Sequence, residues 1–395
     1  MKRTIAAASL CLCAALVPPG GHGDAAASAT PANPIQTFPL GEGAAGAVWI
    51  EVGDVNGDGL PDVVTANEST NNLSVLLNDG KGGFLPAIVS PSTGSQPKSV
   101  ALGDFNGDGK LDAVTANFGS GTMSVFFGNG DGTFQPAVTF PIGIQTQSVA
   151  VGDLNNDGLP DIVIASVQSE NYEAYLSNGD GTFTGPITFT FNNGYAGMTQ
   201  IKLGDMDGDG ILDVVGIYGY GQGFQVWRGR GDGSFYLWSH PLSFGTIPYP
   251  NGLALGDFNG DGVLDVALGN YQYGAIGVSK NEGNGYFSHA VDSQSAQATI
   301  LLAVGHLDSD RFLDAVSTGL TTPALDVSYG LGKGMFSTPT RYATGHTVAA
   351  AVIGRFGPSR AAAIAYTTGS EVGLLRPTRS ATDLHDAGAD GDRAD

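Results

Sequence analysis

The chain repeats one sequence unit seven times, at intervals of 49 to 52 residues. In the first five copies a short apolar run ends in Gly-Asp. This Asp opens a nine-residue loop with Asp at positions 1, 5 and 9, Asn or Asp at position 3 and Gly at position 6. The five loops span residues 54–62, 104–112, 153–161, 205–213 and 257–265. Repeats of roughly 50 residues are typical of propeller blades, so the spacing predicts a seven-bladed β-propeller.

The pattern inside each copy is that of β-strands. Apolar residues form short runs rich in Val, Ile, Phe and Thr, bounded by Gly, Asn and Asp, and no 3.6-residue period is sustained. In the second copy this pattern predicts strands over residues 98–103, 111–116 and 123–128, and a fourth that starts at Phe134 and ends near Pro141. We therefore expect an all-β fold in which each copy forms a blade of four antiparallel strands.

The seventh copy is one strand short. It supplies apolar runs over residues 348–353, 362–367 and 372–375 and then ends at Pro377. An unassigned apolar run over residues 35–40 precedes the first copy. We expect this N-terminal strand to join the last blade, which closes the ring and covers two open sheet edges.

A glycine-rich turn between the third and fourth strands ends in Phe in six copies. Gly suits turn positions that need a positive φ. We expect the aromatic ring that follows to fill the gap between neighbouring blades. The six residues are Phe84, Phe134, Phe183, Phe235, Phe287 and Phe336.

The Asp loops are candidate metal sites. Their carboxylates, the side chain at position 3 and the backbone carbonyl at position 7 offer five or more oxygens to one ion. Calcium accepts six to eight oxygen ligands in flexible geometry, and the five loops contain no His or Cys that would favour zinc or copper. The alternative is that these Asp residues only cap turns. The predicted ligands of five Ca2+ ions are Asp54, Asn56, Asp58, Asp62, Asp104, Asn106, Asp108, Asp112, Asp153, Asn155, Asp157, Asp161, Asp205, Asp207, Asp209, Asp213, Asp257, Asn259, Asp261 and Asp265.

Two copies depart from the loop pattern. In the sixth, His306 replaces the first Asp and Arg311 replaces the Gly, so calcium binding there is left open. The seventh loop, residues 355–363, keeps the spacing without any carboxylate, and we expect no metal in it. The carboxylates that remain in the sixth loop are those of Asp308, Asp310 and Asp314.

The two ends differ in composition from the repeats. A basic start, an apolar run over residues 4–17 and an Ala-Ser-Ala sequence ending at Ala29 predict a cleaved secretory signal over residues 1–29. The propeller is then expected over residues 30–377, followed by a disordered acidic tail over residues 378–395. Both cysteines lie in the signal, so we expect a disulfide-free protein in the periplasm, on the cell surface or in the medium.

The charge balance excludes one class of partner. The net charge is −21, from 38 acidic and 17 basic residues, which makes nucleic acid an unfavourable partner. The basic residues form no cluster that would attach the chain to an anionic membrane, and we expect no membrane insertion after signal cleavage. We expect a monomer.

Three motifs together resemble the FG-GAP/VCBS repeat family, which includes integrin α-chain propellers and many secreted bacterial proteins. They are the apolar-Gly-Asp strand end, the D-x-[ND]-x-D-G-x-x-D loop and the G-x-G-x-G-x-F turn, and they cover roughly residues 35 to 377. The resemblance implies a propeller whose calcium loops are structural and lie on one face. Members include adhesive, glycan-binding and ligand-recognising propellers and some that are attached to enzymes, so the resemblance does not choose among these roles.

A tyrosine-rich set of loops is the candidate ligand face. Tyr residues are interleaved with Asn and Gln in the second-to-third-strand loops and the blade connections of blades three to five. Flat aromatic faces beside neutral hydrogen-bonding groups are typical of sugar or peptide recognition. The alternative is that the rings seal gaps between blades. The candidate residues are Tyr195, Tyr218, Tyr220, Tyr249, Tyr271 and Tyr273.

These observations favour a binding or adhesion module for glycan or protein ligands over an enzyme. The abundant carboxylates are assigned to metal, which makes them poor general acids or bases. His240, His289 and His346 have no paired nucleophile or ligand spacing in the sequence. The alternatives are a calcium-dependent lyase or hydrolase acting on polysaccharide, with a site assembled across blades, and a purely structural surface protein.

Overall fold

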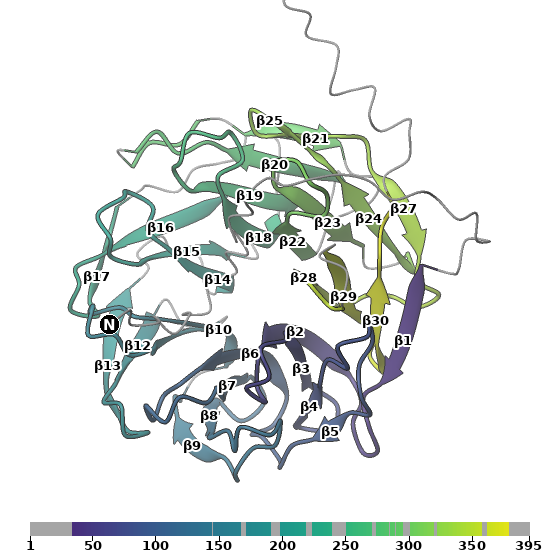
Figure 1. The fold of residues 1–395 in the computed structure, drawn as a ribbon. Coiled ribbons are helices and arrows are strands. Elements are labelled where there is room, and N and C mark those ends of the chain that lie inside the picture. Colours follow the sequence, from purple (N-terminus) through teal and green to yellow (C-terminus); the bar gives the residue numbers. More distant parts are fainter. Residues whose placement is uncertain are drawn as a thin grey trace, which may run out of the picture.

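A ring of seven sheets forms the protein (Figure 1). The computed structural model describes residues 34–143, 145–166, 171–190, 198–218, 223–238, 250–270, 274–283, 285–288, 290–294, 301–319, 322–357 and 362–378. Within these ranges every regular element is a β-strand, and seven four-stranded antiparallel sheets stand around a central opening. The predicted all-β, seven-bladed propeller is therefore confirmed. The predicted signal and all but the first residue of the predicted tail lie outside the described residues.

In blades one to six the strands follow one another along the chain from the centre of the ring to its rim. Blade one consists of β2 (Ala47–Gly53), β3 (Asp62–Asn67), β4 (Asn72–Leu76) and β5 (Ile88–Val89). Blade two consists of β6 (Pro97–Gly103), β7 (Asp112–Asn117), β8 (Thr122–Phe126) and β9 (Val138–Pro141). Blade three consists of β10 (Thr146–Gly152), β11 (Asp161–Ser166), β12 (Asn171–Ser177) and β13 (Phe183–Thr190).

The next three blades follow the same order. Blade four consists of β14 (Met198–Gly204), β15 (Asp213–Tyr218), β16 (Phe224–Gly229) and β17 (Phe235–Leu237). Blade five consists of β18 (Pro250–Gly256), β19 (Asp265–Asn270), β20 (Ala275–Ser279) and β21 (Val291–Gln294). Blade six consists of β22 (Leu301–Gly305), β23 (Asp314–Thr318), β24 (Ala324–Ser328) and β27 (Thr340–Ala343), with a small hairpin of β25 (Gly330–Gly332) and β26 (Met335–Phe336) before its last strand.

Blade seven takes its strands from both ends of the chain. Its inner three strands are β28 (Ala350–Gly354), β29 (Ala363–Thr367) and β30 (Glu371–Leu375), and its fourth is β1 (Ile35–Pro39). β1 runs antiparallel to β30, with Ile35 opposite Leu375 and Pro39 opposite Glu371 (Figure 1). The edge of β30 is therefore paired rather than open, which removes a row of unsatisfied backbone groups.

One register recurs in all seven blades. The Gly that ends the inner strand pairs with position 9 of the loop that follows it. Position 9 therefore belongs to the sheet, whereas positions 1 to 8 form the hairpin connection. The pairs are Gly53–Asp62, Gly103–Asp112, Gly152–Asp161, Gly204–Asp213, Gly256–Asp265, Gly305–Asp314 and Gly354–Ala363.

The Phe residues of the glycine turns pack between blades, as predicted. Five of the six are buried, and Phe183 is partly buried. Phe183 in blade three contacts the ring of Phe105, which is position 2 of the second loop, with centroids 5.7 Å apart. The pairs Phe336–Phe258 and Phe84–Phe356 repeat this contact at 5.8 and 5.3 Å across two further blade boundaries. The apolar core is thus a belt that runs from blade to blade around the ring.

The loops gather on two rims. The Asp loops and the glycine turns share one rim, where the N–H of Gly181 donates to the carbonyl of Phe105 in the preceding blade at 3.2 Å. The second-to-third-strand loops and the blade connections share the other rim, where the N–H groups of Thr93 and Gln96 both donate to Asn71. The Asp-loop rim is the first place to look for a site, because the charged side chains of the repeat are concentrated there.

Candidate functional site

Each complete Asp loop is wound around its own carboxylates. In the first loop the carboxylate of Asp54 accepts hydrogen bonds from the N–H groups of Gly57, Asp58 and Gly59 at 2.8 to 3.1 Å. The carboxylate of Asp58 accepts from the N–H of Leu60 at 2.8 Å. The other four complete loops repeat the bonds from positions 5 and 6 to position 1 and from position 7 to position 5. This winding brings the polar atoms of positions 1, 3 and 5 together in one turn of the chain.

The winding depends on two residues with positive φ. Position 6 is Gly in all five complete loops, and Gly59 has φ 83°. Position 4 is Gly in four of them and Asn156 in the third loop, where φ is 60°; Asn adopts this conformation more readily than other residues with a side chain. In the sixth loop Ser309 and Arg311 occupy these positions and neither has positive φ. The sixth loop therefore follows a different path.

The Asp at position 9 has a role that the sequence analysis did not anticipate. Asp112 is fully buried, and its two oxygens accept hydrogen bonds from the N–H of Phe105 at 2.9 Å and of Gly128 at 2.8 Å. Phe105 is position 2 of the same loop, whereas Gly128 begins the glycine turn 16 residues later. The carboxylate therefore joins the two hairpins of a blade. The same pair of bonds is made by Asp62, Asp161, Asp213, Asp265 and Asp314.

Burial sets the acidity of these position-9 carboxyls. Removal from water disfavours the charged form and raises the pKa from its ordinary value of 3.8, while the two N–H donors act in the opposite direction and the loop carboxylates at positions 1, 3 or 5 raise it further. The net result is a pKa of about 6 for Asp62, Asp112, Asp161 and Asp265 and of about 7 for Asp213 and Asp314. In the absence of a cation these groups hold protons below pH values of about 6 to 7, whereas an ordinary Asp loses its proton near pH 3.8.

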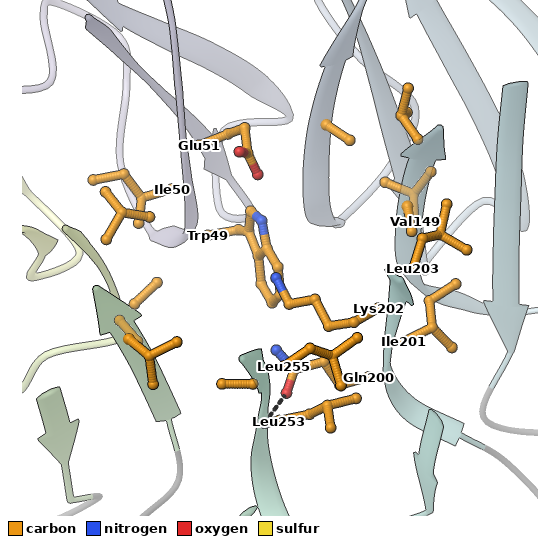
Figure 2. Close-up of a pocket in the computed structure, with 18 of the residues that line it drawn as sticks. Trp49, Ile50, Glu51, Val149, Gln200, Ile201, Lys202, Leu203, Leu253 and Leu255 are labelled. Carbon is orange, nitrogen blue, oxygen red and sulfur yellow. Dashed lines mark hydrogen bonds between the residues drawn. The ribbon is translucent and has the colours of Figure 1, made fainter. Parts of the chain in front are cut away.

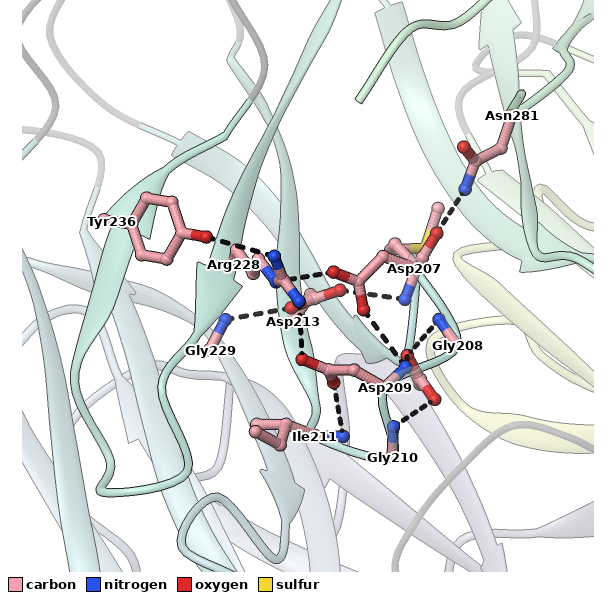
Figure 3. Close-up of polar contacts among 12 residues, drawn as sticks. Asp207, Gly208, Asp209, Gly210, Ile211, Asp213, Arg228, Gly229, Tyr236 and Asn281 are labelled. Atoms are coloured by element: carbon pink, nitrogen blue, oxygen red, sulfur yellow. Dashed lines mark hydrogen bonds and ion pairs between the residues drawn. The ribbon is translucent and has the colours of Figure 1, made fainter. Parts of the chain in front are cut away.

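An arginine side chain from a neighbouring strand pairs with the carboxylates of the fourth loop (Figure 3). The carboxylates of Asp205, Asp207 and Asp209 lie within 4.8 Å of one another. The guanidinium of Arg228, at the end of β16, contacts Asp207 at 2.5 Å through Nε and Asp209 at 2.8 Å through Nη2. Two of the predicted calcium ligands are thus paired with an arginine. This pairing was missed in the sequence analysis.

The sequence contains a signal for Arg228. The fourth loop is the only complete loop with Asp rather than Asn at position 3, so it has four carboxylates instead of three. Arg228 adds one positive charge and brings the formal charge from −4 to −3, which equals that of the first and third loops. The equivalent residue in blade one, where position 3 is Asn56, is the uncharged Leu77. In blade five, where position 3 is Asn259, the equivalent residue is Lys280, so a cation at this position also occurs beside a loop with three carboxylates.

In the sixth and seventh loops, which lack some or all of the Asp residues, His306 and Arg376 donate hydrogen bonds to backbone carbonyls of the loop. In the sixth loop the Nδ1–H of His306 donates to the carbonyl of Phe312, which is position 7, at 3.0 Å. Its three carboxylates nevertheless lie within 4.8 Å of one another. In the seventh loop the guanidinium of Arg376 donates to the carbonyl of Phe356 at 3.0 Å and to that of Gly82 in blade one at 2.5 Å. Arg376 therefore joins blades seven and one at the loop without carboxylates.

The donor sets of the complete loops fit a hard divalent cation. All their donors are oxygens, and the three that converge in the fourth loop are carboxylates. Position 9 does not conflict with metal binding, because a carboxylate oxygen that accepts one N–H keeps a second lone pair. Oxygen-only donor sets without His or Cys favour calcium or magnesium over zinc or copper.

The predicted tyrosine face lies almost entirely outside the described residues. Tyr195, Tyr220, Tyr249, Tyr271 and Tyr273 belong to undescribed segments, and Tyr218 is described only as the last residue of β15. A further Tyr of this region, Tyr172, is buried and stacks on Phe189 at 5.1 Å between centroids. For Tyr172 packing between side chains is the observed role.

Comparison with known families gives two matches. The model of an FG-GAP-like repeat matches residues 54–115, 104–164, 153–216 and 205–268, and the model of an FG-GAP repeat matches residues 249–288. No curated protein matches the chain. No helix long and apolar enough to span a membrane occurs in the described part of the chain.

Solved structures share the fold at low sequence identity. BBS1N, in a crystal structure of its complex with ARL6DN, is 13% identical, with a TM-score of 0.60 over 87% of this chain and 95% of that one. A lectin from Agrocybe aegerita, in a structure of its specific recognition of non-reducing terminal N-acetylglucosamine, is 20% identical, with a TM-score of 0.55 over 84% of this chain and 85% of the lectin. At these identities the likeness establishes the propeller fold alone.

Proposed function

Because this chain belongs to the FG-GAP repeat family, we propose that it is a secreted propeller, stabilised by calcium at its five complete Asp loops, that acts as a binding module for glycan or protein ligands. It has no catalytic role in this proposal. The ions would be bound by the carboxylates of positions 1, 5 and 9 with the side chain at position 3. Their role is to neutralise a cluster of like charges, so that metal binding contributes to the stability of the fold.

The observation behind the proposal is how the loop carboxylates are used. In each complete loop the carboxylates of positions 1 and 5 accept hydrogen bonds from the loop backbone. Both oxygens of position 9 accept N–H groups, one from each of two hairpins. Carboxylates held in this way have a structural role and are poorly placed to transfer protons to or from a substrate. What the ring offers a partner is then the opposite rim and the central opening. The same fold is used by a lectin and by a propeller that binds a protein, which supports both ligand classes.

A glycan array probed with the purified protein tests this function. We expect binding to a defined class of glycans in millimolar calcium and loss of binding after chelation, because the ions stabilise the fold that positions the ligand site. If the folded protein binds no glycan but binds a defined protein, its ligand is a protein and not a glycan. Turnover of a polysaccharide, detected as new reducing or unsaturated ends, would overturn it in favour of a lyase or hydrolase.

Arg228 is expected to weaken calcium binding at the fourth loop. A unit positive charge about 4 Å from a divalent ion costs about 1–2 kcal/mol even in a medium as polar as water, which corresponds to roughly tenfold in affinity. The Arg228→Leu variant should therefore bind calcium about tenfold more tightly at one site and unchanged at the others. Calorimetric titration of the calcium-free protein measures both values.

The matched control is the double variant Asp207→Asn with Arg228→Leu. It recreates the combination of Asn56 and Leu77 found in blade one, so its fourth loop should bind calcium like the other complete loops. If Arg228→Leu leaves every calcium affinity unchanged, the guanidinium does not compete with the ion.

A further inference from the structure

The central channel of the ring has an unusual pattern of side chains. The third residue before each Asp loop lines the channel in all seven blades. In five blades this residue is Ala or Val, which leaves the wall apolar and smooth. In blades one and four it carries opposite charges. The seven residues are Glu51, Ala101, Ala150, Lys202, Ala254, Ala303 and Val352.

An indole ring completes this polar group (Figure 2). Trp49 precedes Glu51 by two residues on β2, so both side chains project from the same face of the strand into the channel. The ammonium group of Lys202, which belongs to β14, lies 5.8 Å from the centroid of the Trp49 ring. β2 and β14 belong to non-adjacent blades, so the contact crosses the channel. At the level of Trp49 the channel lining also includes Gln200 and the small residue Ala350.

Packing alone does not account for this composition. A channel that needs only to be filled would use apolar side chains, because burying charged groups is costly. Trp49, Glu51 and Lys202 all remain partly exposed. Their neighbour Gln200 is fixed, since its side-chain oxygen accepts a hydrogen bond from the N–H of Leu253 at 2.8 Å (Figure 2). The group is therefore solvent-accessible and rests on a rigid wall.

We propose that the channel binds one carboxylated sugar ring, of the uronic acid type. The apolar face of the sugar stacks on the indole of Trp49, which offers a flat apolar surface. The sugar carboxylate pairs with the ammonium of Lys202, and sugar hydroxyls donate to the carboxylate of Glu51. The protein as a whole is strongly acidic, so an anionic ligand needs a dedicated cation, and Lys202 is the cation among the residues that line this channel. This inference rests on the proposed glycan-binding function and names the ligand class.

The test is a titration of the calcium-loaded protein with sodium glucuronate and, separately, with glucose, followed by tryptophan emission. The Lys202→Met variant should lose about tenfold or more in affinity for glucuronate, because a charge-assisted pair is removed, while its affinity for glucose stays within about twofold. Lys81→Met removes the same charge from an exposed glycine turn and should change neither affinity. In Trp49→Phe the emission change should disappear, since the two other Trp residues lie in blade four, away from the channel lining.

Two results would overturn the channel site. One is a wild-type protein that does not bind glucuronate, and the other is a Lys202→Met variant that binds it as tightly as the wild type. The glycan array decides the broader function separately. If Lys202→Met and Trp49→Phe keep the full array profile, the protein binds glycans elsewhere, so the proposed function stands and the channel site fails. If array and titration are both negative for a folded protein, both proposals fail for glycans.

Discussion

Replacing Asp112 with Ala is expected to destabilise the protein by about 2–4 kcal/mol in chelator, and by more in calcium, where a proposed ligand of the ion is lost as well. The substitution leaves the buried N–H groups of Phe105 and Gly128 without acceptors, and each unsatisfied buried donor costs about 1–2 kcal/mol. It also separates the Asp loop from the glycine turn of the same blade. Chemical denaturation in excess chelator and in millimolar calcium measures the free energy of unfolding in each state.

Asp108→Ala is the matched control for this experiment. Asp108 is position 5 of the same loop, is exposed, and accepts an N–H from within the loop, that of Lys110 at 3.0 Å. Its removal should cost little in chelator and should lower stability mainly in calcium. If Asp112→Ala and Asp108→Ala cost the same in chelator, position 9 has no role beyond metal binding and the interpretation of its two hydrogen bonds is wrong.

Blade seven explains how the chain tolerates an Ala at this position. Ala363 occupies position 9 there and is buried opposite Gly354. The fourth strand of this blade is β1, which comes from the other end of the chain, so no glycine turn joins the third and fourth strands. The carboxylate is absent from the one blade in which the hairpin that it would join is also absent.

Much of the fold was predictable because the repeat states it seven times. The Gly-Asp strand ends and the spacing of the loops predicted the blades, and the Phe of each glycine turn was correctly expected between blades. These features depend on local sequence, such as the run before Asp104 or the turn before Phe134. Position 9 was identified as a candidate ligand, but its bond to a donor 16 residues away depends on how two hairpins pack, which a loop motif does not describe.

The residues that were missed are those in which single copies differ from the repeat. Arg228 compensates for the extra carboxylate of Asp207, and Lys202 and Glu51 interrupt a ring of Ala and Val. A consensus over the seven copies averages out substitutions that occur in one copy only, such as Lys202 and Glu51. The contact between Lys202 and Trp49 joins residues of non-adjacent blades, so it became visible only once the ring was closed.

Raising the pH from about 5 to about 8 is expected to lower the melting temperature of the calcium-free protein by at least about 5 °C. The position-9 carboxyls have a pKa of about 6 or 7 when folded, against 3.8 for an ordinary Asp. Between these values the folded state holds more protons than the unfolded state, so stability falls as the pH rises and the loss is complete above pH about 7. Other carboxyls, such as that of Asp131, have a pKa lowered by hydrogen bonds to Thr133 and titrate below this window.

Calcium should reverse the direction of this pH dependence. The ion binds the deprotonated carboxylates, so protons compete with it. A rise in pH from about 5 to about 8 therefore increases the affinity for calcium and raises the melting temperature. Thermal melts over this range, with chelator and with saturating calcium, give the two slopes. Charge repulsion in a chain of net charge −21 would also lower the melting temperature of the calcium-free protein as the pH rises. Salt screens this repulsion far more than it affects buried carboxyls, so melts in about 0.1 and about 0.5 M salt distinguish repulsion from deprotonation of position 9. A calcium-free melting temperature that rises with pH would mean that the position-9 carboxyls are ionised in the folded protein without the ion.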